Sequence, residues 1–238
     1  MEEIVLDGIV VSSKDFKEKD KIITIYTPNK GLVNLSLRGV KGEKAKLKIA
    51  KELFCFGKYR CFFKGNMGTV IGFEPIETFY ALSQDIDKYI EASIILSTIK
   101  QLGKFNESNL PLFYEVVYAL MALLEPQTQK DIVICKFLVD IFQSMGYRLN
   151  IEFCSNCFKD FGEKIFFNTD IGAFVCEKCY DVYSIQVENV VKQNILKLVE
   201  TDLKNIHTLK LSAIKDTYKI LALNYKFRFD KELFKFSL

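Results

Sequence analysis

The 238-residue chain has a single histidine, four prolines, no tryptophan and no long hydrophobic run. Catalysis by a Ser-His-Asp or Cys-His arrangement would have to use His207 alone, which disfavours most such hydrolase classes. The longest uninterrupted apolar run, Val116 to Leu124, has nine residues, whereas a membrane-spanning helix needs about 20. The N-terminus also lacks the basic and apolar regions of a secretory signal, so we expect a cytoplasmic protein without a membrane helix.

The seven cysteines are an odd number in a chain without an export signal, which argues against a disulfide framework and for free thiols or metal binding. Hydrophobic residues make up 49% of the chain and charged residues 26%, close to the ordinary globular mixture. A chain of this length is sufficient for one large domain or two small ones, each with its own core.

The first third of the chain has the pattern of a small barrel. Up to about residue 80, apolar residues recur with a period of two in short segments rich in β-branched and aromatic residues. Turn-forming residues at 28–31 and 65–68 predict two hairpins. We expect strands near Ile4 to Ser12, Lys21 to Thr27, Leu32 to Arg38, Leu53 to Phe63 and Thr69 to Phe73. Five short antiparallel strands are sufficient for a closed five-stranded OB-fold barrel.

After Tyr80 the period changes to that of helices. Caps are expected at Ser83 or Asp85, at Asn109 before Pro111, and at Thr128 in a capping box with Asp131, with Gly146 ending that third helix. Two more helices are expected over 186–206 and from 212 to near the end. We therefore predict an α+β fold made of a barrel (1–80), a helical domain (81–150 and 184–238) and an inserted cysteine-rich module (151–183).

Four cysteines have the spacing of a zinc site. Cys154 and Cys157 are separated by 18 residues from Cys176 and Cys179, which matches the C-x2-C-x15-20-C-x2-C pattern. Four thiolates complete a tetrahedral site and leave no open position for water or substrate, so we predict one structural Zn²⁺.

The residues between the two cysteine pairs resemble a zinc ribbon, with strands at 164–168 and 173–175 joined by a turn at 170–172. Thiols without metal and a redox dithiol are the alternatives at this site. The remaining cysteines are expected to be buried small hydrophobic residues: Cys55, Cys61 and Cys135.

Positive charge is concentrated in the predicted barrel. Residues 1–80 contain 14 Lys and Arg against 10 acids, a net charge of +4, whereas the rest of the chain has 19 against 20, a net of −1. Segment 30–64 alone has ten basic residues against two acids. Such a surface binds a phosphate backbone by releasing its counterions, or it only keeps the chain soluble. The candidate DNA contacts are Lys30, Arg38, Lys41, Lys44, Lys46, Lys48, Lys58, Arg60 and Lys64.

Lysine supplies 29 of the 33 basic residues. Lysine is a mobile point charge, whereas arginine has the rigid fork that reads base edges, so we expect binding without sequence specificity. Aromatic side chains offer stacking faces for a single strand, although alternation requires several of them to be core. The candidates are Tyr26, Phe54, Phe56, Tyr59, Phe62 and Phe63.

The order and spacing of several motifs resemble the family of the bacterial DNA repair protein RecO. The N-terminal stretches that are similar are Leu6 to Val11, Glu18 to Thr27, Lys30 to Val33 and Leu37 to Lys41. Pro75 to Leu82 resembles the junction of that family into its helical domain. Phe142 to Tyr147, followed by the two cysteine pairs, resembles its helix and zinc module.

The resemblance implies a nucleoid-associated mediator of DNA repair and homologous recombination. Members of the family bind single- and double-stranded DNA, anneal complementary strands, contact the C-terminal tail of the single-strand DNA-binding protein, and with RecR help to load RecA. The resemblance implies a protein that is not an enzyme and hydrolyses no nucleotide, and the sequence indeed contains no P-loop motif. The resemblance also implies that the four paired cysteines bind zinc and that Arg38 and Lys41 contact DNA. One departure is Ile171-Gly172-Ala173, where a Gly-Gly pair is expected.

Two other functions stay open from the sequence. The chain could be a zinc-containing protein-interaction scaffold whose basic segment only aids solubility, or an enzyme that uses His207 or scattered carboxylates. The tail peptide is expected to bind the last helix, although an amphipathic core helix with solvated lysines is the alternative there. The residues proposed for that contact are Lys215, Tyr218, Lys219 and Tyr225, with Leu221, Lys226 and Arg228 beside them.

Overall fold

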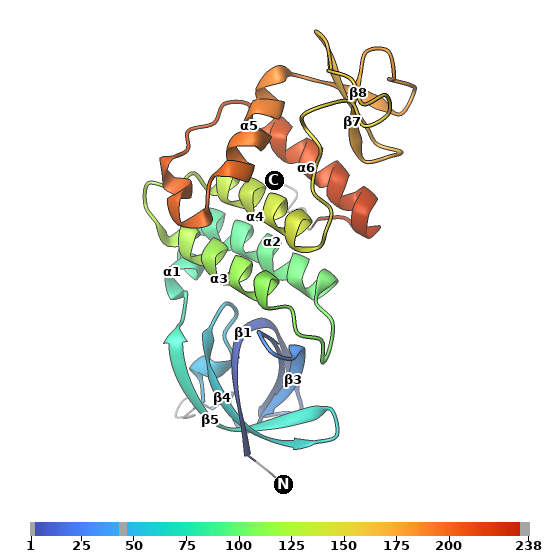
Figure 1. Ribbon diagram of the computed structural model, residues 1–238. Helices are drawn as coiled ribbons and strands as arrows, with labels where there is room; N and C mark the ends of the chain where they lie inside the picture. The colour runs from blue at the N-terminus through green and yellow to red at the C-terminus, as the bar shows by residue number, and fades with distance from the viewer. Residues whose placement is uncertain (1–2, 43–46, 234–238) are drawn as a thin grey trace. The chain divides into compact units, whose positions relative to one another are not determined.

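The computed structural model describes residues 3–42 and 47–233 and divides into two compact units, Met1–Leu120 and Met121–Leu238 (Figure 1). The first unit holds a β-barrel followed by helices, and the second holds helices and a three-stranded sheet. The predicted α+β class is confirmed. In the described part of the chain, no helix is both long and apolar enough to span a membrane.

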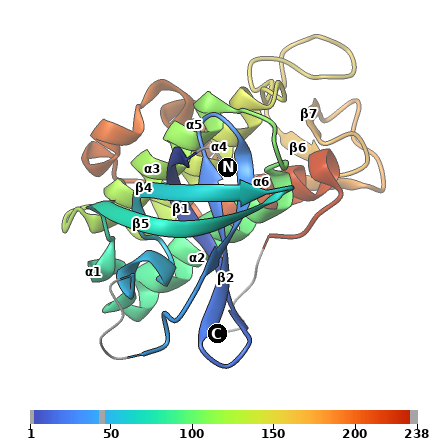
Figure 2. The ribbon, with the colours of Figure 1, turned by 90° about the horizontal axis from the view of Figure 1, so that it is seen from below.

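Five strands form a closed, OB-like barrel, as the sequence predicted, and their order around it is β1-β2-β3-β5-β4. Neighbouring strands are antiparallel except β3 and β5, which run parallel, with Asn34 opposite Met67. Figure 2 shows β4 and β5 side by side along their length. The strands are β1 (Glu3–Phe16), β2 (Asp20–Thr27), β3 (Gly31–Leu37), β4 (Phe56–Lys64) and β5 (Met67–Glu77).

Alternation along the strands builds the barrel core. On β2, Ile23 and Ile25 are fully buried and Thr24 between them faces outward. The short 3-10 helix η1 (Ile49–Lys51) packs on this core, and its buried Ala50 carbonyl accepts a hydrogen bond of 3.2 Å from the Tyr59 hydroxyl. Burial raises the pKa of Tyr59 well above its ordinary value, so the hydroxyl stays a neutral donor.

The expected burial of the three unpaired cysteines is confirmed, since Cys55, Cys61 and Cys135 are all inaccessible to solvent. Burial raises the pKa of Cys55 and of Cys61 to about 12, which keeps both thiols protonated and unreactive at neutral pH. These two cysteines belong to the barrel core.

Three strands differ from the prediction. β5 runs over Met67–Glu77 and so extends beyond the expected Thr69 to Phe73 at both ends. β1 continues to Phe16 and pairs with β2 from Ile9 to its end, but the last residues of β1 are half-buried or exposed on both faces, so they show no alternation of burial. β4 begins at Phe56 and not at Leu53, because Phe54 has a left-handed φ of 69° and turns the chain.

Two helices of the first unit begin where their caps predict, at Asp85 and Asn109, whereas the short helix that ends at Ser83 was not predicted. The helices are α1 (Tyr80–Ser83), α2 (Ile86–Leu102) and α3 (Leu110–Leu124), whose last turn lies in the second unit. The Asp85 carboxylate accepts from the backbone N–H groups of residues 87 and 88, and the Asn109 side chain accepts from that of residue 112. Phe113 of α3 packs on the barrel, with its ring 6.0 Å from Tyr26 and 5.8 Å from Phe56.

The second unit contains α4 (Lys130–Ser144), α5 (Asn189–Glu200), the 3-10 helix η2 (Leu203–Thr208) and α6 (Ile214–Phe229). α4 packs against the other three. Gly146 follows α4 with φ 81°, as expected of a helix stop. The capping box at Thr128 is wrong: its N–H bonds to the Glu125 carbonyl in the preceding turn, its buried hydroxyl has no partner, and Gln129 is the N-cap.

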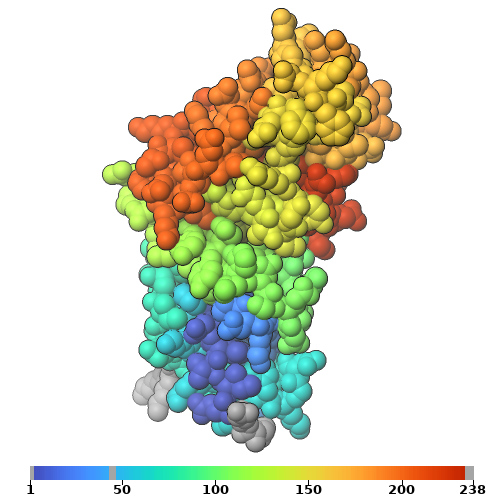
Figure 3. Space-filling view, viewed as in Figure 1, coloured from blue at the N-terminus to red at the C-terminus, as the bar shows by residue number. Residues whose placement is uncertain are grey.

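A three-stranded sheet with the order β7-β6-β8 lies between α4 and α5 in the sequence. β6 (Ile165–Asn168) and β7 (Ala173–Cys176) are the predicted hairpin. The expectation of helix from residue 186 is wrong at its start, because β8 (Ser184–Val187) pairs with β6. We call residues 151–187 the cysteine module, and its surface is the yellow to light orange region of Figure 3.

Candidate metal centre and nucleic-acid interface

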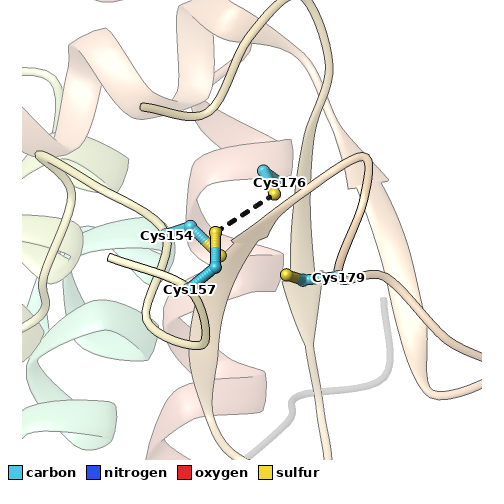
Figure 4. Close-up of side chains that lie close together, drawn as sticks. All are labelled: Cys154, Cys157, Cys176 and Cys179. Atoms are coloured by element: carbon cyan, nitrogen blue, oxygen red, sulfur yellow. Dashed lines mark hydrogen bonds between the residues drawn. The ribbon is translucent and has the colours of Figure 1, made fainter. Parts of the chain in front are cut away.

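The sulfur atoms of the four paired cysteines all lie within 4.8 Å of one another. Their side chains point toward a common centre, and the Cys157 and Cys176 sulfurs are 3.8 Å apart (Figure 4). A tetrahedron with Zn–S distances of about 2.3 Å has sulfur atoms about 3.8 Å apart. The donor type, number and spacing therefore fit one tetrahedral thiolate site.

Two turns place the ligands. The Cys154 N–H donates to the Lys159 carbonyl at 2.8 Å, and the Cys179 N–H donates to the Cys176 carbonyl at 3.0 Å. A third backbone bond, from Ser155 to the Phe174 carbonyl at 3.0 Å, ties the first turn to β7. The two halves of the site are thus joined by the backbone of the ribbon.

The surroundings of Cys154 favour its thiolate. Burial opposes ionisation of this thiol, but backbone N–H groups of residues 156, 157 and 176 point at its sulfur and lower its pKa to about 6. A metal ion binds the deprotonated form, so this sulfur is prepared as a ligand.

The turn at 170–172 is formed with one glycine, Gly172, in place of the expected Gly-Gly pair. Gly172 has φ 58°, and a Cβ there would lie 2.1 Å from the Phe227 ring. Its carbonyl accepts from Asn224 at 3.0 Å and from Arg228 at 3.2 Å, so this turn docks the cysteine module on α6. Although this turn departs from the expected Gly-Gly pair, the four cysteines still lie close together.

Several of the candidate DNA contacts have acidic neighbours in the structure. Lys58 lies between Asp7 on β1 and Glu74 on β5 in the strand register. Arg60 forms an ion pair of 3.7 Å with Glu3. These acids partly cancel the positive charge on the outer face of β4.

Lys41 likewise contacts Asp15 at 3.3 Å, and the same carboxylate contacts Lys21 at 3.0 Å. Lys21 first and Lys41 second hold the pKa of Asp15 below its ordinary value. The remaining described candidates lie elsewhere: Arg38, Lys48 and Lys64 are exposed, and Lys30 lies over the Phe63 ring at 5.5 Å. Lys44 and Lys46 lie outside the described residues.

The candidate stacking residues divide between core and surface. Tyr26, Phe54 and Tyr59 are buried and so serve the core, while Phe56, Phe62 and Phe63 are half-buried. No sequence pattern distinguishes Phe105, which follows α2, is 56% exposed and forms β-bridges with Gly31 and Leu32 of β3. What marks Phe105 as a candidate is an exposed aromatic ring in a loop, and that exposure is known only from the folded structure.

The residues proposed on the last helix are only partly available to a partner. Lys215 and Lys219 are exposed on α6, and Tyr218 is half-buried. Tyr225 is fully buried with its ring 4.9 Å from Phe229, so its proposed partner contact is wrong: the side chain belongs to the core of the unit. Elsewhere in the second unit, His207 lies exposed on η2.

Two models of one known protein family match nearly the whole chain. Residues 1–79 match the family model of the recombination protein O N terminal, and residues 83–233 match that of the recombination protein O C terminal. A DNA repair protein RecO of Caldicellulosiruptor bescii is 25% identical over 94% of this chain and 92% of its own length. Those of Listeria monocytogenes (28%, over 78% and 73%) and Oceanobacillus iheyensis (23%, over 87% and 80%) are also similar.

Proposed function

Because the chain belongs to the recombination protein O family, we propose that it is a mediator of DNA repair and homologous recombination that works by binding DNA. It binds single- and double-stranded DNA without sequence specificity and anneals complementary strands. With RecR it helps to load RecA onto DNA coated with the single-strand DNA-binding protein. It acts as a binding protein and not as an enzyme.

The observation that carries this proposal is the basic surface of the OB-like barrel, on which Arg38, Lys48 and Lys64 are exposed. Annealing requires no acid, base or nucleophile. A positive surface lowers the repulsion between two polyanions and raises their local concentration, after which base pairing supplies the free energy. Lysine suits this task because it contacts phosphates without selecting bases.

Salt titration of DNA affinity tests the proposal. If about five basic side chains contact phosphates, log K against log salt concentration should have a slope near −3.5 for a single strand, at about −0.7 per contact. The same preparation should anneal complementary oligonucleotides faster than they anneal alone. An absence of binding at low salt would overturn the proposal.

Zn²⁺ is the metal we propose for the four cysteines, because tetrahedral thiolate sites suit zinc and a site without an open position is structural. The ion would stabilise the cysteine module, whereas the barrel would bind the DNA. The expected stoichiometry is one zinc per chain.

A scaffold without direct DNA contact is the second candidate, and the cysteine module favours it. This module has three lysines against six acids, and Phe158, Tyr180 and Val182 are exposed on it. An acidic surface with apolar side chains suits protein contacts and repels DNA. A protein of this kind would show no salt-dependent DNA affinity.

The C-terminal tail of the single-strand DNA-binding protein is proposed to bind near Lys215 and Lys219 on α6. Reversing both charges should weaken binding of an acidic tail peptide and leave the zinc content unchanged. Reversal of Lys197 and Lys210, which are also exposed in the second unit, is the matched control. Equal peptide affinity of the two double variants would count against this site.

A further inference from the structure

Two adjoining hollows lie on the outer face of the barrel in the first unit, each with a volume of about 380 Å³. They share Leu32, Asn34 and Phe105 and therefore lie next to each other, and we call the two together the barrel groove. One hollow is also lined by Ile4, Lys30, Val33, Phe63, Gly65, Asn66 and Asn106. The other is also lined by Ser12, Lys14, Ile22, Thr24, Met67 and Lys100.

The barrel groove differs in charge from the outer face of β4. Among the described residues, its lining contains lysines 14, 30 and 100 and no acid. On β4, by contrast, Lys58 has an acid on either side and Arg60 pairs with Glu3. A phosphate chain is therefore attracted to the groove more strongly than to β4, although segment 30–64 contributes basic residues to both.

Phe105 is fixed at the centre of the groove. The Leu32 N–H donates to the Lys104 carbonyl at 2.9 Å, so the loop continues the pairing of β3. Gly31 has φ 58°, and a Cβ there would lie 2.2 Å from the same carbonyl. The Ser108 hydroxyl also donates to the Pro28 carbonyl at 2.8 Å. These contacts hold the loop against the barrel with the Phe105 ring exposed. Because the loop is already ordered, it loses little conformational entropy when a ligand binds.

The rest of the groove has the composition of a stacking surface. Phe63 is half-buried with the Lys30 ammonium over its ring, and Met67 is 36% exposed. The groove is also lined by short polar side chains on β2 and β3, where the Thr24 hydroxyl donates to the Asn34 side chain at 2.8 Å. Aromatic faces flanked by cations are the recurrent way in which proteins hold unpaired nucleotides.

We propose that the barrel groove holds unpaired nucleotides, with a base stacked on Phe105 and phosphates contacted by Lys14, Lys30 and Lys100. This rests on the proposed DNA-binding function and names the single strand as the ligand of this site. A base inside a duplex has no free face for Phe105. The groove therefore separates single-strand from duplex binding, which the basic surface alone does not.

The test compares Phe105→Ala in the full chain with the wild type. Loss of one stacked base should lower the affinity for a labelled single strand about 5- to 150-fold, while duplex affinity stays unchanged. Phe158→Ala, which removes a more exposed phenylalanine of the cysteine module, should change neither. Phe105 is 56% exposed, so its truncation leaves the core intact, and equal thermal unfolding of the two variants verifies this.

A second variant gives a direct signal, because the chain contains no tryptophan. Phe105→Trp should keep single-strand affinity, and its emission should fall on addition of a single strand but not of a duplex. If the wild type binds single strands while Phe105→Ala binds equally well and Phe105→Trp shows no quenching, the groove is not the site and the proposed function stands. If the wild type binds no DNA, the proposed function itself fails.

Discussion

The barrel and the cysteine module are both small, largely antiparallel β structures, but they are held together differently. Among the described residues, the barrel closes its sheet around a core of 13 buried residues from every strand, from η1 and from the connecting loops. The module has three strands of four residues each, and few large side chains such as Phe167 and Phe174 are fully buried in it. A sheet this small is not stable by burial alone, so we expect the module to depend on the proposed Zn²⁺.

The two regions also differ in charge. Residues 1–80 have a net charge of +4, whereas residues 151–187 have three lysines against six acids, a net of −3. Four thiolates on Zn²⁺ would add about −2 to the module. Exposed aromatics occur beside the barrel and in the module: Phe105, in the loop after α2, lies among lysines, and Phe158 lies in the acidic module. Charge and not aromatic exposure therefore distinguishes the surface that we propose for DNA.

The largest expected effect comes from removing the metal. Replacing Cys176 by Ser, or adding a strong chelator, removes a binding free energy on the order of 10 kcal/mol from the module. Backbone amides of residues 151–187 should then lose protection against hydrogen exchange. DNA affinity should stay unchanged, because the barrel has its own core.

Metal analysis and hydrogen-exchange mass spectrometry on the same sample measure this effect. Cys135→Ala, at a buried cysteine outside the cluster, should retain one zinc per chain. If backbone amides of the barrel lost hydrogen-exchange protection together with those of the module, the metal would stabilise both regions, and the contrast between them would be wrong.

A smaller effect is expected from charge. Changing Lys14, Lys30 and Lys100 to Gln removes three proposed phosphate contacts and should reduce the magnitude of the salt slope by about 2. The affinity loss should be roughly 100-fold at 0.1 M salt and should vanish near 1 M. The matched control changes the three lysines of the module, Lys159, Lys164 and Lys178. Equal losses in both triple variants would show that net charge alone, and not the groove, governs binding.

The sequence was sufficient for features that depend on local pattern. Alternation located the five strands, Asp85 and Asn109 located two helix starts, and the cysteine spacing grouped four ligands that the fold brings within 4.8 Å. In each case a short segment contains all the chemistry that determines the structure. β8 was missed because its pattern of Ser184 to Val187 continues into a helix without a turn signal.

The features that depend on distant residues could not be predicted. Lys58 and Arg60 look available in the sequence, but strand register places Asp7, Glu74 and Glu3 beside them. Tyr225 has the spacing of a surface residue among lysines, yet packing of α6 buries it. Phe105 lies far along the chain from β3 and reaches it only through the fold. Register and tertiary contact, and not composition, decide these roles.

The smallest expected effect concerns the acid that lowers the positive charge of the barrel. Asp15 is exposed and contacts Lys21 and Lys41, which lower its pKa, so the folded state favours its charged form. The resulting stability is present above the pKa of the unfolded chain, about 3.9, and is lost as the pH falls through the lower folded value. A carboxyl titration followed by NMR should give a midpoint below 3.9. Asp15→Asn should free the two lysines and raise DNA affinity slightly at low salt, and a midpoint at or above 3.9 would show that neither lysine is held by this carboxylate.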